Sequence, residues 1–408
     1  MKILFITHFF APDSGAASKL HTRLAQRLHQ RGHDVTVLTT MPHYPQGIIP
    51  DDYRGKWQVI EDRDGVHVIQ MALWASPSRK ISRRLLSQLS FMLTCALRGI
   101  VIERPDVIFI ENQPIFTGLA GWFVSKVKRT PYVMNVADHW PEYLYVAGIV
   151  ARDSLIYRLF EALTNLTQRD ADAITAMYAN LLDKMALRIG PVENSHVIYD
   201  SVDLWLYQDQ DERAFRDKYN LGDQRLVTFL GILGPHIDLE TMLAVVAQLR
   251  DYEDVTVLFV SAGAQQDALD EALKQPQFDH CQQIDWLPAE EVPALWAVSY
   301  LTFWAVADNE LDKLRFQTKL YEAIASGTPT VIAVEGLMSD ILQESQAGIA
   351  VPHGDVPAMR DALRHLLDEP DYHAQMSARG RAYGAEHFDA EKQTIAYENA
   401  LKSVARQP

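Results

Sequence analysis

The chain has 408 residues, of which 48% are hydrophobic and 22% charged, which fits two soluble globular domains better than one ordinary core. Its formal net charge of -15 argues against nucleic acid as a main partner. Cys95 and Cys281, its two cysteines, suit a reducing cytoplasm and exclude a disulfide framework and a thiolate metal cluster. The sequence contains no uncharged apolar stretch of 18 residues, so we predict no membrane span.

The first half of the chain alternates apolar runs with helix-length amphipathic segments. We interpret KILFIT as a buried strand and not as a secretion signal, because the run is short, is broken by Thr7 and His8, and lacks a cleavage pattern. A helix is predicted over 18–31. The next predicted strands are DVTVLTT, DVIFIE, PYVMNV, ADAITAM and SHVIYD. Continuous apolar strands separated by helices predict a parallel sheet covered on both faces.

A second series of strands follows the polar stretch 208–225. Its members are RLVTFLG, DVTVLFVSAG, CQQIDWL, LTFWAV, TPTVIAV and GIAVPHGD. We therefore predict an α/β protein with two doubly wound, Rossmann-like domains, residues 1–203 and 204–387, facing a central cleft at the carboxyl ends of their strands. The last segment, 388–408, reads as a helix that could pack on either domain.

The segment TKLYEAIASG carries the strongest candidate site. It predicts a helix that starts near Thr318, as N-cap, and stops at Gly327. Lys319 in the first turn opposes the helix dipole, and Arg315 adds positive charge just upstream. A bound diphosphate would satisfy both cations and the free helix N–H groups. Glu322, one turn inside, could accept two hydroxyl hydrogen bonds from a ribose, or merely pair with Lys319 at the surface.

A turn that contains glycine follows the first strand of each predicted domain. HFFAPDSGAAS contains Gly15 without the Gly-x-Gly-x-x-Gly dinucleotide fingerprint, and GILGPHID contains Gly231 and His236. Gly15 could let the backbone approach a ligand closely or could serve only as a tight turn.

At this point the sequence resembles a known family. KLYEAIASGTPTVIA is similar to the C-terminal signature of glycosyltransferase family 4, the retaining GT-B sugar transferases. The resemblance extends over nearly the whole chain, through HFFAPDSGAASKLHTRLAQRLHQRGHDVTVLTTMPHYP, ADAITAMYANLLDKM, VIYDSVD and GIAVPHGD. The stretch RPDVIFIENQPIFTGLAGWFVSKVKRTPYVMNVADHWPE resembles the branch that builds lipopolysaccharide and exopolysaccharide.

The resemblance implies transfer of a sugar from a nucleotide-diphosphate donor to a hydroxyl of a saccharide or lipid-linked saccharide, with retention and without metal or cofactor. It implies that Glu322 binds the ribose and that Arg315 and Lys319 neutralise the diphosphate. The full set of residues expected to bind the donor is Gly15, Gly231, His236, Phe316, Gln317, Thr318 and Glu322. Asp138 and His139, just past a strand end, are the candidates for acceptor orientation or proton handling.

Two positions depart from the family pattern. Leu314 replaces the first acid of the usual Glu-x7-Glu, so its sugar contact is lost or comes from Asp308, Glu310 or Asp312. The usual Arg and Lys after the second domain's first strand are absent. Two alternatives therefore stay open: another GT-B enzyme, such as a sugar-nucleotide epimerase, and an inactive protein that only binds sugar nucleotides.

One segment bears on where in the cell the protein is located. Residues 79–102 place Arg79, Lys80, Arg83 and Arg84 ahead of an apolar helical stretch. Such a basic amphipathic helix can lie on an anionic membrane surface, or it can be a domain helix with a solvated basic end. We therefore expect a cytoplasmic protein that contacts the inner face of the membrane peripherally.

Overall fold

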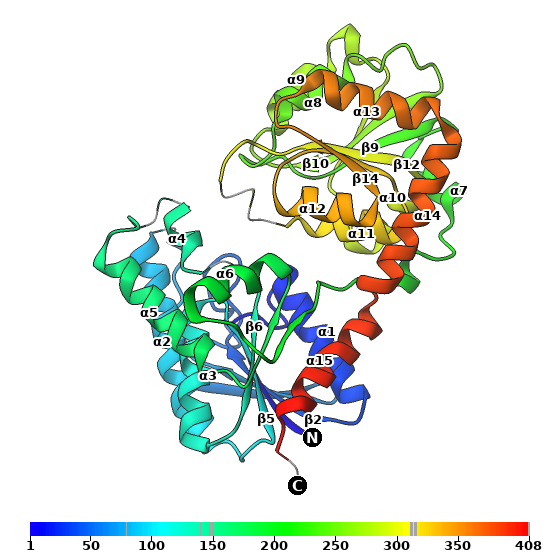
Figure 1. Cartoon of the computed structure of the whole chain (residues 1–408). Helices are drawn as coiled ribbons and strands as arrows, with labels where there is room; N and C mark the ends of the chain where they lie inside the picture. The colour runs from blue at the N-terminus through cyan, green and yellow to red at the C-terminus, as the bar shows by residue number, and fades with distance from the viewer. Residues whose placement is uncertain are drawn as a thin grey trace. The chain divides into compact units, whose positions relative to one another are not determined.

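A computed structural model describes most of the chain, namely residues 1–78, 80–138, 140–146, 148, 150–310, 313 and 316–406. It divides into two compact units, one formed by Met1–Asp200 with Glu391–Pro408 and the other by Ser201–Ala390 (Figure 1). The predicted domains, 1–203 and 204–387, differ from these bounds by a few residues.

The first unit contains an eight-stranded sheet with the order β3-β4-β2-β1-β5-β6-β7-β8. Every neighbouring pair is parallel except β3 and β4. Its strands are β1 (Lys2–Ile6), β2 (Asp34–Thr40), β3 (Gln58–Arg63), β4 (Val66–Met71), β5 (Val107–Glu111), β6 (Tyr132–Val136), β7 (Ala173–Ala176) and β8 (Ser195–Val197). Its helices are α1 (Ala16–Gln30), α2 (Ile81–Val101), α3 (Ile115–Lys128), α4 (Glu142–Val146), α5 (Leu155–Arg169), α6 (Ala179–Ile189) and α15 (Ala390–Val404).

Burial explains why the predicted strands of this unit form. All five residues of β5 and of β6 are buried, as expected for central strands with helices on both faces. Figure 1 shows α1 and α15 on one face and α2 and α3 on the other. The hairpin β3–β4 was not predicted. Asp64 and Gly65 join its strands, both with positive φ, which is the geometry of a tight two-residue turn.

The second unit contains a six-stranded parallel sheet with the order β11-β10-β9-β12-β13-β14. Its strands are β9 (Arg225–Ile232), β10 (Val255–Ala262), β11 (Cys281–Ile284), β12 (Ser299–Ala305), β13 (Thr330–Ala333) and β14 (Gly348–Val351). Its helices are α7 (Glu212–Tyr219), α8 (Leu239–Val246), α9 (Gln266–Leu273), α10 (Val292–Val298), α11 (Thr318–Ser326), α12 (Leu337–Ser345), α13 (Val356–Asp368) and α14 (Pro370–His387). Short 3-10 turns cover Leu204–Tyr207, Pro276–Phe278 and Ala289–Glu291.

The last helix, α15, packs against the core of the first unit. Ala400 and Leu401 are buried in the same cluster as the side chains of β1 and β2. Glu398, only 4% exposed, accepts hydrogen bonds from Arg31 Nε at 2.8 Å and pairs with His33 Nε2 at 2.9 Å. Burial alone would raise the pKa of Glu398, but the hydrogen bonds from Lys402, Arg31 and His33 and the charge of Arg31 lower it to about 2.

The structure confirms the predicted class of two Rossmann-like parallel sheets with helices. Among the described residues, no helix combines the length and the apolar character needed to cross a bilayer.

Candidate functional site

The predicted phosphate site lies at the start of α11. This helix runs from Thr318 to Ser326, and its C-cap Gly327 has a φ of 76°, a left-handed conformation that glycine adopts without strain. The prediction of Thr318 as N-cap is wrong, because Gln317 occupies that position and Thr318 is the first helical residue. Within the described part of the chain, Gln317 gives the helix no side-chain cap. The Leu320 N–H donates to the Gln317 carbonyl at 2.9 Å, and the N–H groups of Thr318 and Lys319 come before it at the start of the helix, where a ligand could accept from them.

Lys319 turns back from the first turn of α11 toward the end of β9. Its Nζ donates to the Leu230 carbonyl at 3.0 Å and lies 4.2 Å from the ring centroid of Trp304 and 4.6 Å from that of Phe229. No ion pair joins it to a carboxylate of the described residues, so the surface Lys319–Glu322 pair is not formed. Because the surroundings are desolvating, the pKa of Lys319 falls to about 7.

Glu322 lies one turn inside α11 and is half-buried. The indole Nε1 of Trp296, from α10, donates to Glu322 Oε2 at 3.2 Å. Trp296 itself is 1% exposed, so its ring can hold the carboxylate in one orientation. This arrangement fits a carboxylate that meets a polar ligand, since a fixed acceptor loses little freedom on binding.

The other donor-binding candidates of this unit lie at the end of β9, in the turn that follows it, and at the start of α11. Gly231 is the penultimate residue of β9, and a Cβ placed on it would lie 3.0 Å from Lys319 Nζ. Phe316 stacks on Tyr321 of α11 with ring centroids 4.0 Å apart. His236 lies in the turn that joins β9 to α8, where its carbonyl accepts from the Ala307 N–H. Arg315 and Leu314 lie outside the described residues.

In the first unit, Gly15 and Asp138 lie at the carboxyl edge of the sheet. Gly15 is the N-cap of α1 with φ 145°, and a Cβ on it would lie 3.1 Å from a ring carbon of Tyr44. Asp138 follows β6 and accepts a hydrogen bond from Gln113 Nε2. His139 lies outside the described residues.

A buried polar cluster, whose contacts were not predicted, lies at the same edge of the sheet. Glu111 is 1% exposed, pairs with His21 Nε2 at 3.2 Å and accepts from Asn135 Nδ2 at 2.6 Å. Burial alone would lower the pKa of His21, but the Glu111 carboxylate outweighs it and raises the pKa. Burial also raises the pKa of Asp200 to about 7. Only the placement of charged residues at strand ends could have signalled this cluster.

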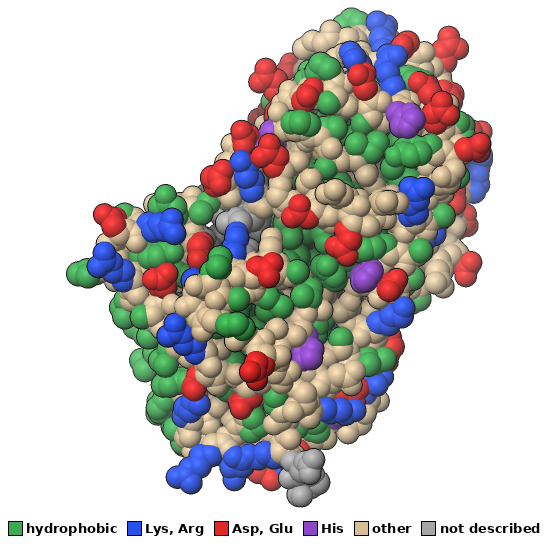
Figure 2. Space-filling model, viewed as in Figure 1, with side chains coloured by type: hydrophobic (Ala, Val, Ile, Leu, Met, Phe, Trp, Pro, Cys, Tyr) green, Lys and Arg blue, Asp and Glu red, His purple; other side chains and the backbone are tan. Residues whose placement is uncertain are grey.

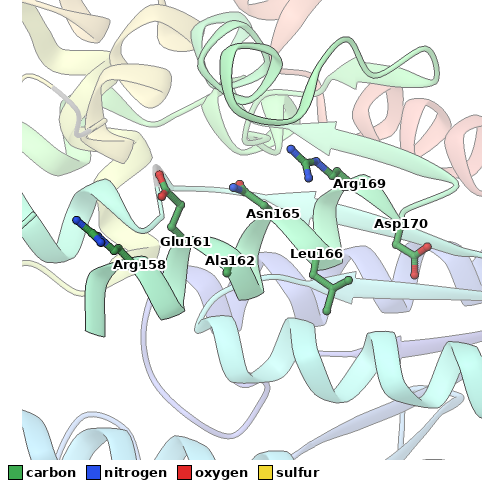
Figure 3. A pocket seen from close by; sticks show the side chains of 7 residues that line it. All are labelled: Arg158, Glu161, Ala162, Asn165, Leu166, Arg169 and Asp170. Carbon is green, nitrogen blue, oxygen red and sulfur yellow. The ribbon is translucent and has the colours of Figure 1, made fainter. Parts of the chain in front are cut away.

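A separate hollow of about 500 Å³ lies along α5 (Figure 3). Its lining consists of Arg158, Glu161, Ala162, Asn165, Leu166, Arg169 and Asp170, none of which is a predicted site residue. Figure 3 shows the polar side chains from Arg158 to Arg169 on one side of α5 and Leu166 on another. Within the described residues, no group of three His, Cys, Asp or Glu side chains could hold a metal ion.

Comparison with known proteins assigns both units. The model of the glycosyl transferase 4-like domain matches residues 15–199, and the model of the glycosyl transferases group 1 matches residues 224–369. One relative, from Escherichia coli K12, is provisionally named as a glycosyl transferase of colanic acid biosynthesis. It is 22% identical over 302 residues, covering 71% of this chain and 74% of the relative.

Two further matches extend over nearly the whole chain. A GDP-mannose-dependent α-mannosyltransferase of Mycobacterium tuberculosis is 23% identical over 386 residues, which cover 93% of this chain and 91% of the relative. Among solved structures, Anabaena HepE in complex with UDP superposes with a TM-score of 0.71 at 18% identity, covering 99% of this chain and all of HepE. The two family matches and the two-sheet fold agree, and the chain belongs to the GT-B glycosyltransferases of family 4.

Proposed function

We propose that this glycosyltransferase moves a sugar from a nucleotide-diphosphate donor to a hydroxyl group, with retention of configuration and without a metal ion. The acceptor in this proposal is a saccharide or a lipid-linked saccharide, used in polysaccharide or glycoconjugate synthesis. Two relatives support the choice of donor, since HepE has been solved with UDP and with UDP-glucose and the mycobacterial relative is named for GDP-mannose.

The observation that carries the proposal is the environment of Lys319. An ammonium group with a lowered pKa lies at the uncapped start of α11, where helix N–H groups already favour an anion. Within the described part of the chain, Lys319 Nζ donates to the backbone carbonyl of Leu230, and a phosphate oxygen could replace this carbonyl with a stronger, charge-assisted bond. Arg315, by its place in the sequence, would add a second cation.

The proposed chemistry follows from where charge develops. As the bond between the anomeric carbon and the phosphate oxygen breaks, negative charge builds on the departing diphosphate. Lys319 and the first N–H groups of α11 would stabilise that charge, while Glu322 would accept hydrogen bonds from the ribose hydroxyls. The acceptor oxygen forms the new bond to the anomeric carbon and loses its proton. Asp138 and His139 stay the candidates for orienting the acceptor or handling that proton.

The remaining assignments are also proposals. Gly231 would leave room beside Lys319 for a phosphate, and Gly15 would let the backbone of the first unit approach the donor. His236, Phe316, Gln317 and Thr318 would complete the donor site. The proposed location is the cytoplasm, with peripheral contact at the inner face of the membrane.

The test is turnover of a panel of nucleotide sugars by purified protein, with release of the nucleoside diphosphate as the readout. Lys319→Ala and Glu322→Ala should each reduce kcat/KM at least tenfold, whereas the exposed control Lys274→Ala should not. Unchanged turnover in both site variants would refute the site. Epimerised donor without acceptor would favour the epimerase alternative, and binding without any turnover would favour the inactive binding protein.

A further inference from the structure

Four of the five leucines of α2 lie on its exposed side. Leu86, Leu89, Leu93, Leu97 and Ile100 follow helical spacing along one face and are 38% to 58% exposed. The buried residues of the same helix are mostly small or polar: Ser87, Phe91, Thr94, Cys95 and Gly99. A helix that only covered a sheet would have the opposite arrangement, because apolar side chains gain free energy by leaving water. The outer face of α2 is therefore built to contact something apolar.

The two neighbouring helices continue this arrangement. Helix α3 contacts both α2 and α5, and its Phe123 and Val127 are exposed one turn apart. On α5, Leu155, Leu159 and Leu166 are 81%, 58% and 42% exposed at helical spacing. Figure 2 shows hydrophobic side chains gathered along the left margin, where Figure 1 places these helices. We refer to the exposed apolar stripes of α2, α3 and α5 together as the apolar face.

A tryptophan lies beside the apolar face. The backbone N–H of Trp74 donates to Ser90 Oγ of α2 at 2.8 Å, and the Trp74 side chain is 42% exposed. Tryptophan is enriched where a protein meets the boundary between lipid headgroups and acyl chains, because its ring is apolar and its N–H is polar.

The two helices α2 and α3, which form most of the apolar face, carry only positive charges. Helices α2 and α3 contain arginine and lysine but no aspartate or glutamate, and α5 has a single acid, Glu161. The chain as a whole carries 53 acidic and 38 basic residues. The hollow on α5 is lined by Arg158 and Arg169 and also by Glu161 and Asp170, so the excess of positive charge lies on α2 and α3 (Figure 3).

We propose that the apolar face docks on an anionic phospholipid surface, with its leucine and phenylalanine side chains among the headgroups and its cations on lipid phosphates. An anionic surface attracts the basic side chains of α2 and α3, whereas a second copy of this chain on the same face would bring like charges together. Docking would bring a lipid-linked acceptor to the enzyme, an inference that rests on the proposed function. It extends the membrane contact predicted for residues 79–102 to α3 and α5.

The test is co-sedimentation of the full chain with vesicles of phosphatidylcholine alone and of phosphatidylcholine with 30% phosphatidylglycerol. We expect binding to the anionic vesicles that decreases with salt. The double variant Leu93→Gln/Leu97→Gln and the double variant Leu155→Gln/Leu159→Gln should each weaken it by about tenfold or more. Arg83→Gln/Arg84→Gln should weaken it about 25-fold. Leu187→Gln on α6, 88% exposed, is the matched control and should bind as the unchanged protein does.

Three further measurements make the outcome decisive. Circular dichroism and thermal melting should show that every variant folds, since all substituted side chains are exposed. Release of nucleoside diphosphate without vesicles should be unchanged in the variants, so a failure of the proposed function is seen separately. The proposal would be overturned if the apolar-face variants bound vesicles as strongly as the unchanged protein does. So would a dimer in sedimentation velocity that the same variants dissociate while no vesicle binding occurs, because a second copy would then occupy the face.

Discussion

The affinity of the donor site for a diphosphate should depend steeply on pH through Lys319. Desolvation lowers the pKa of this lysine to about 7 in the free protein, whereas a bound diphosphate would stabilise the charged form. Above pH 7, binding must therefore take up a proton. One pH unit well above the pKa corresponds to about 1.36 kcal/mol, or a factor of about ten in affinity.

The size of the effect can be worked out for a practical interval. With a pKa of about 7, the charged fraction of Lys319 falls about eightfold between pH 7.5 and 8.5. The terminal phosphate of UDP, a suitable probe, is ionised throughout this interval because such groups have a pKa of about 6. Isothermal titration calorimetry should show the dissociation constant of UDP rising about eightfold, with nearly one proton taken up at pH 8.5.

Two variants separate Lys319 from other titrating groups. Lys319→Arg keeps its charge at every pH tested, so its affinity for UDP should be nearly independent of pH. Lys319→Met should bind UDP weakly, with an affinity that does not change with pH. A wild-type affinity that does not change between pH 7.5 and 8.5, or a slope that persists in Lys319→Met, would refute the reasoning.

Three other perturbations follow from single contacts. Glu398→Gln should lower the free energy of unfolding by about 1–3 kcal/mol in urea titrations at pH 7, because it weakens charged hydrogen bonds that hold α15. Since the pKa of Glu398 in the folded protein is lowered to about 2, this loss of stability should vanish as the pH falls from 5 toward 2. A loss that persists at pH 2 would contradict the prediction. Gly231→Ala should weaken UDP binding about tenfold, because the new Cβ would lie 3.0 Å from Lys319 Nζ; calorimetry that finds no change would show that this space is not used. Trp296→Phe should raise the donor KM about three- to tenfold with little change in kcat, because Glu322 loses its 3.2 Å hydrogen bond; a fall in kcat alone would assign the indole another role.

The fold was predictable where burial dominates the sequence. Strands such as β5 and β10 are continuous apolar runs, and they lie in the sheets as predicted. The hairpin β3–β4 was not predicted because β3 is an edge strand whose residues are at most partly buried, and its sequence QVIEDR resembles a polar loop. Its one local signal was the Asp64-Gly65 pair.

The candidate site was predictable only in part, because local sequence cannot supply distant partners. A cation in the first turn of α11 is visible in the sequence, but the carbonyl of Leu230 and the ring of Trp304 come from other strands. Burial among residues from these strands lowers the pKa of Lys319 by desolvation, and the periodicity of the sequence did not indicate that burial. The pair formed by His21 and Glu111 was missed for the same reason, since α1 and β5 are far apart along the chain.

The most direct test of the donor site is a crystal structure with UDP bound. We expect an oxygen of the terminal phosphate within hydrogen-bonding distance of Lys319 Nζ and of the first N–H groups of α11, with the ribose hydroxyls on Glu322. Lys319 still bonded to the Leu230 carbonyl, with UDP bound elsewhere, would contradict the account.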